Sequence, residues 1–255
     1  MEPAVKILGY GKTRHVQPFL DFLGGRMATS DELKQNRRLP VVVAGSTKRI
    51  VPNTCQENQV PWYSVDSGYI GNADRKWKLW FRVTVGAWQD SGPIRERDSK
   101  RLQSIQFDQE PVVRGSRIMI VPPHPKVAAT FDLGEVDDWI TATISKIKQH
   151  TDREVFIRNR PDSRNKRQFK HALQDNVNAV VVYNSNCGVE SLVHGIPTVA
   201  LGLCASTAMS QPIDSIDQLN SVDADKRQSW LKHLSYCQFT QAEMRNGTAW
   251  RILHE

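Results

Sequence analysis

The sequence has few cysteines, and none of them are closely spaced. The 255-residue chain has four, far apart and without a Cys-x-x-Cys pair: Cys55, Cys187, Cys204 and Cys237. Close cysteine spacing is typical of structural zinc sites and of small disulfide-bonded domains. The sequence therefore predicts neither, and we expect reduced, partly buried thiols.

Long apolar runs are also missing. None approaches the roughly 18 residues that a membrane-spanning helix requires. The first residues, MEPAVKILGYGKTRH, lack the long apolar centre of a signal peptide. We therefore expect a cytosolic protein with no membrane partner.

Two familiar motifs are incomplete. The stretch GYGKT at 9–13 has Lys6 where the first glycine of a phosphate-binding P-loop should stand. The sequence contains one Asp-x-Asp pair, Asp223 and Asp225, which precedes an apolar-periodic run. There an N-terminal helix charge explains the carboxylates better than a metal does. We predict no metal site and no bound cofactor.

Composition is that of an ordinary globular protein. With 39% hydrophobic residues, the chain can bury the core of one large domain or two small ones. Its formal charge of +7 favours a polyanionic partner such as nucleic acid. The same charge also serves solubility, and both interpretations stay open.

Apolar strands alternate with amphipathic helices along the chain. Before a polar, charge-rich stretch at 87–115, the pattern predicts a helix over 14–25 and strands over 5–11, 39–45, 60–66 and 77–85. After it, the pattern predicts strands over 117–123, 153–159, 178–184 and 197–202, separated by helices over 137–150, 166–174 and 188–195. Regular alternation of this kind predicts a parallel sheet covered on both faces.

One junction in this pattern carries several small polar residues. The stretch VVYNSNCGVESLVHGIPTVALG, residues 181–202, leads from a strand through Ser185, Asn186 and Gly188 to Glu190. Ligands of such sheets bind outside the carboxyl ends of the strands, and a helix start favours phosphate. Gly188 allows a ligand or another chain segment to come close. Alternatively, Ser185 or Asn186 is only an N-cap, and Glu190 only a favourable charge in the first helical turn.

Three segments resemble the donor side of known enzymes. Residues 184–202 resemble the donor-binding segment of GT-B glycosyltransferases, in which a small polar loop holds phosphates and a glutamate binds ribose. The segment VPPHPKV, 121–127, resembles the His-Pro loop of sialyltransferase-like and capsule-type GT-B enzymes. Residues 151–166 resemble the arginine-bearing strand and loop that face the same donor.

Other segments resemble small glycosyltransferase-like proteins of bacteriophages, some of them linked to modified DNA bases. They are YSVDSGYIG at 63–71, FRVTVG at 81–86 and the tail YCQFTQAEMRNGTAW at 236–250. Together the resemblances imply an α/β, GT-B-like fold with two Rossmann-like lobes, parallel sheets and a C-terminal helical tail.

The implied organisation has three parts. We expect an acceptor-side lobe at 1–115, a donor-binding lobe at 116–235 and a helical tail at 236–255 that packs back on the first lobe. The tail begins with a capping box, Thr240 to Glu243.

The implied function is transfer of a sugar from a nucleotide sugar, expected to be UDP-linked, to 5-hydroxymethylpyrimidine in phage DNA. The protein would then act in the host cytoplasm, with double-stranded DNA as its partner. Two alternatives stay open: transfer to a polysaccharide or lipid-linked acceptor, and non-catalytic nucleic-acid binding on the same fold.

The charge of the leaving group indicates which residue types to expect at the donor site. A nucleotide leaving group gains negative charge as the glycosidic bond breaks, so cations and N–H donors stabilise the transition state. His124 is a catalytic candidate that contacts phosphate or a donor hydroxyl, or else an inert loop histidine. The predicted donor-binding residues are Arg158, Arg160, Lys166, Ser185, Asn186, Gly188 and Glu190. For the basic ones, a solvated loop is the alternative.

The acceptor side offers a base and basic residues. Asp66 ends an apolar run before Gly68, so it is a candidate base for the acceptor hydroxyl, or else an Asx-turn residue. The predicted nucleic-acid contacts are Arg75, Lys76, Lys78, Arg97, Lys100 and Arg101. For the lysines of 74–82, a half-buried strand with alternating faces is the alternative.

Overall fold

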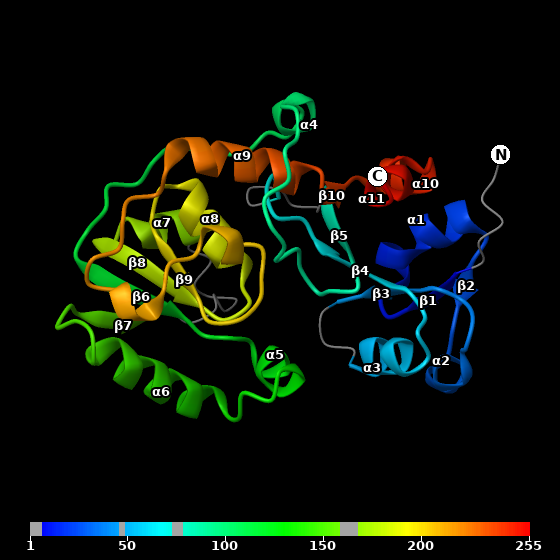
Figure 1. Ribbon diagram of the computed structural model, residues 1–255, viewed down its shortest axis with the longest axis horizontal. Coiled ribbons are helices and arrows are strands. Elements are labelled where there is room, and N and C mark those ends of the chain that lie inside the picture. The colour runs from blue at the N-terminus through cyan, green and yellow to red at the C-terminus, as the bar shows by residue number, and fades with distance from the viewer. Residues whose placement is uncertain (1–6, 46–48, 73–78, 159–167) are drawn as a thin grey trace. The chain divides into compact units, whose positions relative to one another are not determined.

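A computed structural model describes residues 7–45, 49–72, 79–158 and 168–255 (Figure 1). The chain divides into two compact units, one of Met1–Asp90 with Ser235–Glu255 and one of Ser91–Leu234. The tail thus belongs to the first unit. Each unit has its own sheet and its own hydrophobic core.

The unit boundary differs from the expected one at residue 115, because residues 91–115 belong to the second unit. Long-range contacts hold them there. The backbone N–H of Val112 donates to the carbonyl of His194 at 2.9 Å, and the Lys170 ammonium pairs with Asp108. Residues 91–115 lack helical or strand periodicity, so their sequence did not predict the contacts with His194 and Lys170.

The sheet of the first unit is mixed. Its strand order is β10-β5-β4-β3-β1-β2. Four strands run parallel: β1 (Leu8–Tyr10), β2 (Arg26–Met27), β3 (Val41–Ala44) and β4 (Trp62–Ser67). Strand β5 (Phe81–Val85) is antiparallel to β4, and β10 (Gln238–Phe239) is antiparallel to β5. The expected parallel arrangement holds for the four strands β1 to β4. Strands β5 and β10 add an antiparallel edge, because no helix among the described residues crosses back between β4 and β5.

Helices cover both faces of this sheet (Figure 1). One face packs on α1 (Thr13–Leu23), α10 (Gln241–Arg245) and α11 (Thr248–Leu253), and the other on α2 (Ser30–Gln35) and α3 (Ile50–Glu57). The Thr240–Glu243 capping box at the start of α10 is confirmed.

The second unit has a parallel sheet covered on both faces, as predicted. Its strand order is β7-β6-β8-β9, formed by β6 (Arg117–Val121), β7 (Val155–Ile157), β8 (Val177–Val182) and β9 (Thr198–Ala200). Helices α7 (Phe169–Leu173) and α8 (Asn186–Val193) pack on one face and α6 (Val136–Lys148) on the other (Figure 1). All six residues of β8 are buried, because it lies inside the sheet with both faces covered.

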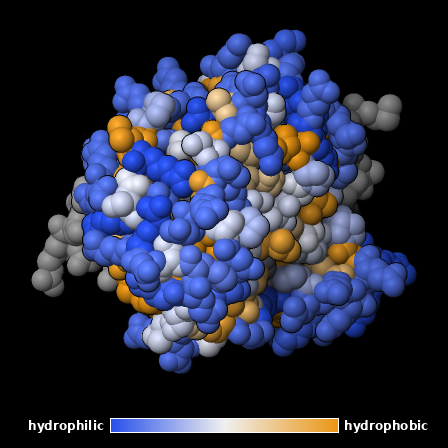
Figure 2. Space-filling model, turned by 60° about the vertical axis from the view of Figure 1, so that its left-hand side comes forward, coloured by the Kyte–Doolittle hydropathy of each residue, from blue (hydrophilic) through white to orange (hydrophobic). Residues whose placement is uncertain are grey.

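The remaining described elements are α4 (Lys100–Gln103), α5 (Pro125–Thr130), α9 (Ala224–Ser235) and the 3-10 helices η1 (Thr207–Met209) and η2 (Ile213–Ser215). Among the described residues, no helix combines the length and the apolar character needed to cross a bilayer. On the face shown in Figure 2, hydrophobic residues form small separate areas among hydrophilic ones.

Candidate functional site

Three neighbouring loops meet at the carboxyl edge of the second sheet. The register pairs Ile120 of β6 with Ile157 of β7, and Val121 of β6 with Val182 of β8, so the three strands end nearly level. Arg158, His124 and Ser185 follow these strands. Adjacent strands lie about 4.8 Å apart. The fold therefore brings three of the predicted donor-side residues to one edge.

Ser185 is the N-cap of α8. Its side-chain oxygen accepts from the amide of Cys187 at 3.2 Å, and its carbonyl accepts from the amide of Gly188 at 3.1 Å. The capping interpretation of Ser185 is thus confirmed, and Asn186 is the first helical residue. The amides of Cys187 and Gly188, which were expected to face a phosphate, thus donate to Ser185 within the turn itself. What α8 offers an anion is chiefly the positive end of its dipole.

Glu190 lies two residues deeper in α8 than its sequence suggested, beyond the first turn. The helix begins at Asn186, two residues before the predicted start, and its first turn contains no acidic residue. The helix-dipole effect is confined to the first turn, so a dipole charge does not explain Glu190. The half-buried carboxylate keeps its predicted role at the donor ribose as a hypothesis.

Gly188 is required by another chain segment. A Cβ atom at this position would lie 2.6 Å from Oγ of Ser206 and 3.1 Å from Cγ2 of Val182. Ser206 is fully buried. The glycine therefore allows α8 to pack closely on the segment after β9, which was one of the two interpretations of this residue.

His124 is the N-cap of α5. Its Nδ1 accepts from the amide of Lys126 at 3.1 Å, and Pro125 occupies the first helical position. Because Nδ1 is an acceptor, the proton of the neutral imidazole is on Nε2. The exposed ring thus presents an N–H donor at the carboxyl end of β6, which suits a phosphate or hydroxyl oxygen.

Arg158 is held by both its backbone and its side chain. Its amide donates to the carbonyl of Ile120 at 2.9 Å, which extends the pairing of β7 with β6. Its guanidinium lies 4.9 Å from the ring centroid of Phe169 at the start of α7. The other predicted cations of this loop, Arg160 and Lys166, lie outside the described residues.

Tyr183, which the sequence analysis did not select, connects two of the loops. Its ring packs against Phe131 at the end of α5, with 5.5 Å between ring centroids. Burial raises the pKa of the Tyr183 hydroxyl, so this side chain stays neutral and serves as a packing element. An aromatic residue directly after a buried strand is the only signal that could have indicated it.

In the first unit, Asp66 belongs to a cross-strand ion pair. It lies in β4 opposite Arg82 of β5, and its Oδ2 is 3.1 Å from Nη2 of Arg82. Its Oδ1 accepts from the amide of Ser67 at 2.7 Å. An Asx-turn would use the amide of Gly68, which donates instead to the carbonyl of Trp80 at 2.9 Å; Asp66 is a strand residue. The carboxylate is near the carboxyl end of β4 and is 26% exposed.

Arg82 is the residue that sequence reasoning missed here. Its side chain is only 7% exposed, and Nη1 also donates to the carbonyl of Ser67 at 3.1 Å. In the sequence it is one of several basic residues among aromatic ones. Only the register that places it opposite Asp66 distinguishes it.

The predicted nucleic-acid contacts divide into two groups. Arg75, Lys76 and Lys78 lie outside the described residues. The second unit contains the others. Lys100 begins α4 and is exposed, with its ammonium 3.9 Å from the Asp98 carboxylate. Arg97 and Arg101 are half-buried, so of these three Lys100 is the most accessible.

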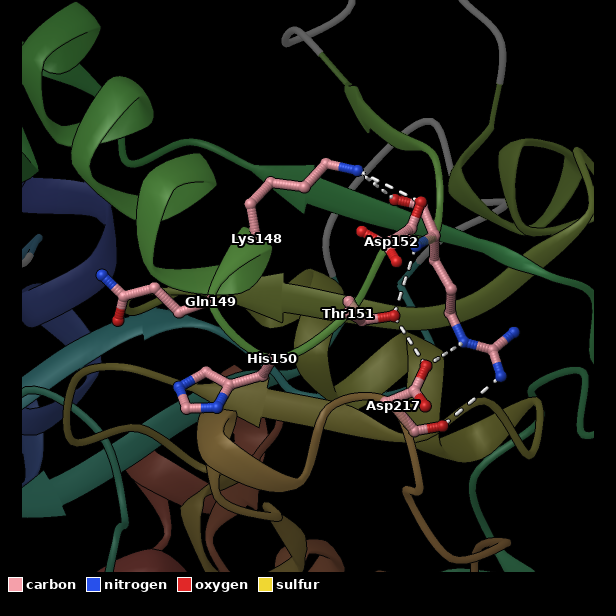
Figure 3. Close-up of a pocket in the computed structure, with 7 residues that line it drawn as sticks. Lys148, Gln149, His150, Thr151, Asp152 and Asp217 are labelled. Carbon is pink, nitrogen blue, oxygen red and sulfur yellow. Dashed lines mark hydrogen bonds and ion pairs between the residues drawn. The ribbon is translucent and has the colours of Figure 1, made fainter.

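A separate polar pocket lies at the opposite edge of the second sheet (Figure 3). Its lining comes from the α6–β7 connection, Lys148 to Arg153, with Asp217. There Asp217 accepts from the Thr151 hydroxyl at 2.6 Å and from Nε of Arg153 at 3.2 Å. The Thr151 bond and then the Arg153 guanidinium hold the pKa of Asp217 below its usual value. The hydrogen-bonding groups of Thr151, Arg153 and Asp217 therefore pair with one another. None of the residues that line this pocket is a predicted site residue.

A scan against protein-family models finds no match, and a search of curated proteins finds none either. Among solved structures, the chain is similar to the β-Kdo 2,7 transferase KpsC of Thermosulfurimonas dismutans. The TM-score is 0.56 and the identity 12%, over 98% of this chain and 99% of that chain. It is also similar to the β-Kdo 2,4 transferase KpsC of the same organism, with a TM-score of 0.49 and 12% identity over 99% and 98% of the two chains. At this identity, the first likeness concerns the fold alone. Together with the two sheets, it shows that the chain has the fold of GT-B glycosyltransferases.

Proposed function

We propose that the protein is a glycosyltransferase that takes its sugar from a nucleotide sugar bound at the carboxyl edge of the second sheet. The observation that carries this proposal is the convergence of Arg158, His124 and the start of α8 on adjacent loops of a GT-B fold. In parallel α/β sheets, this edge is where ligands bind.

Each donor-side group has a role in the proposed reaction. The Nε2–H of His124 and the guanidinium of Arg158 contact phosphate oxygens, with the positive end of α8 beside them. These charges and donors stabilise the leaving nucleotide more in the transition state than in the ground state. Glu190 accepts hydrogen bonds from the ribose hydroxyls.

On the acceptor side, we propose Asp66 as the base that takes the proton of the acceptor hydroxyl if the enzyme inverts the anomeric carbon. Arg82 then orients the carboxylate through Oδ2. In a retaining enzyme, the leaving phosphate accepts the proton, and Asp66 supports the acceptor loop instead.

For the acceptor, we propose 5-hydroxymethylpyrimidine in double-stranded DNA. This rests on the charge of +7 and on the resemblance of residues 63–71, 81–86 and 236–250 to phage proteins. A polysaccharide or lipid-linked acceptor is the second candidate, because segment 121–127 resembles the His-Pro loop of capsule-type enzymes and the structurally similar KpsC of Thermosulfurimonas dismutans is a Kdo transferase.

Calorimetric titration with UDP, CDP, ADP and GDP tests the donor proposal. We expect wild-type protein to bind one of them, with UDP the first candidate. Glu190→Gln should weaken that binding by roughly 1.5–3 kcal/mol, the value of a hydrogen bond to a charged group. Glu110→Gln is the matched control, because Glu110 is an exposed glutamate of the same unit whose backbone carbonyl lies at His194, beyond the far end of α8. Equal affinity of wild type and a folded Glu190→Gln variant would contradict the ribose contact.

Mass analysis of products tests the acceptor. The protein is incubated with a panel of nucleotide sugars and either hydroxymethylcytosine DNA, hydroxymethyluracil DNA or an oligosaccharide. A mass gain on one nucleoside supports the DNA acceptor, and a gain on the oligosaccharide supports the second candidate. Steep salt-dependent duplex binding without nucleotide binding would instead indicate a nucleic-acid-binding protein.

A further inference from the structure

A large apolar side chain is exposed at the same edge as the proposed donor site. Leu203 follows β9, and 73% of its surface is accessible to solvent. Strand β9 pairs in parallel with β8, so Leu203 lies on the loop adjacent to the one that contains Ser185. A single exposed leucine requires no explanation in general; its location beside this turn makes it notable.

The backbone holds Leu203 in this position. Its carbonyl accepts from the Asn184 side-chain amide at 2.7 Å, directly before the Ser185 cap. On one side of it, the amide of Gly202 donates to the carbonyl of Tyr183 at 3.0 Å. On the other side, the amide of Cys204 donates to the Thr207 hydroxyl at 2.9 Å, and Cys204 is buried. The backbone that carries the exposed side chain is therefore anchored on both sides of Leu203.

The four loops of this edge form an ordered row. From β7 to β9 they present a cation (Arg158), an imidazole N–H (His124), the helix start (Ser185) and an apolar side chain (Leu203). With adjacent strands about 4.8 Å apart, the loop of Leu203 is about one strand spacing from the loop of Ser185 and about two from the loop of His124. This arrangement suits a nucleotide whose phosphates lie at the middle loops and whose ribose and base, or transferred sugar, extend to the loops on either side.

Glu190 indicates which part of the donor lies there. Helix α8 joins β8 to β9, so a ribose at Glu190 lies on the β9 side of the phosphates. The group beyond the ribose is the nucleobase, and the transferred sugar then extends toward β7. A nucleobase has broad, weakly polar faces, and ligand sites typically cover such faces with apolar side chains.

We propose that Leu203 packs against the face of the donor nucleobase and so contributes to nucleotide affinity. This inference rests on the proposed function, since it takes the nucleotide position from it. It adds a base contact that neither the cation pattern nor the polar loop of the sequence indicated.

The test compares UDP, or whichever nucleoside diphosphate binds wild type most tightly, with ribose 5-diphosphate, which lacks only the base. We expect Leu203→Ser to weaken binding of the nucleotide about tenfold, as the loss of a few buried methylene-sized groups implies. Binding of ribose 5-diphosphate should not change, and Leu203→Met should restore nucleotide affinity. Val113→Ser is the matched control. Val113 is 89% exposed in the same unit and lies beside Val112 and Arg114, whose partners are His194 and Asn178, away from the carboxyl edge.

The outcomes separate the two proposals. If wild type binds the nucleotide and Leu203→Ser binds it equally well, the base contact is refuted while the proposed function stands. If Leu203→Ser weakens both ligands equally, Leu203 acts on the phosphate or ribose position and the base contact is also refuted. If wild type binds none of the nucleoside diphosphates, the proposed function fails, and this inference fails with it.

Discussion

Replacing Gly188 by alanine tests whether this glycine serves packing or ligand approach. The added methyl group would lie 2.6 Å from Oγ of Ser206, 3.1 Å from its Cβ and 3.1 Å from Cγ2 of Val182. Both neighbours are fully buried. Because Ser206 also contacts Sγ of Cys204 at 3.1 Å, it cannot shift without disturbing a second buried group.

The expected loss of stability follows from two opposing effects. Overpacking a buried site by one methyl group costs roughly 1–3 kcal/mol. Alanine in place of glycine in a helix contributes up to about 1 kcal/mol in the other direction. We therefore expect Gly188→Ala to lower the free energy of unfolding by about 1 kcal/mol, and by no more than about 3 kcal/mol.

Urea unfolding of four proteins measures this effect: wild type, Gly188→Ala, Ser206→Ala and the double variant. Removal of Oγ from Ser206 eliminates the shortest contact, so the double variant should be more stable than the sum of the single changes predicts. Nucleotide affinity of folded Gly188→Ala should equal that of wild type. Unchanged stability combined with weakened nucleotide binding would refute the packing argument and indicate that a ligand approaches Gly188.

Three further predictions concern other parts of the molecule. The hydrogen bond from Lys170 lowers the pKa of Asp108 from its ordinary 3.8, so the carboxylate stabilises the fold above that pH and this contribution is lost as the pH falls below it. Asp108→Asn should therefore reduce stability to urea at pH 7 and much less at pH 3, and a pH-independent difference would contradict this. Asp66→Asn should retain donor affinity and lose about 100- to 10,000-fold in turnover if Asp66 is the base, whereas full activity would exclude that role. Arg158→Lys keeps the charge but loses the planar fork, so turnover should fall, and unchanged turnover would mark Arg158 as a surface residue.

Local periodicity was sufficient to predict the second sheet. Its strands are separated by helices, and such connections return the chain in the same direction, which makes the sheet parallel. Strand β8 consists of valine and alanine except for one asparagine, and this composition already indicated burial on both sides. The capping residue Ser185 was equally readable, because a small hydroxyl residue before a helix satisfies backbone amides that no other local group can reach.

The position of the candidate site was also predictable, since it follows from the direction of the strands. Arg158, His124 and Ser185 each follow a strand of one parallel sheet, and parallel strands end at the same edge. For Glu190, periodicity predicted the correct helix but placed its start two residues late, which put Glu190 wrongly within the first turn.

Other features depend on partners distant in the sequence, and only the tertiary structure decided them. The direction of β5 determines that Arg82 lies opposite Asp66. The packing of Ser206 on α8 determines that residue 188 has no room for a Cβ. The anchoring of the loop after β9 leaves Leu203 exposed beside Ser185. Periodicity along a chain indicates which face of an element is buried. The partner of Asp66, the space at residue 188 and the exposure of Leu203 depend instead on which segment covers that face.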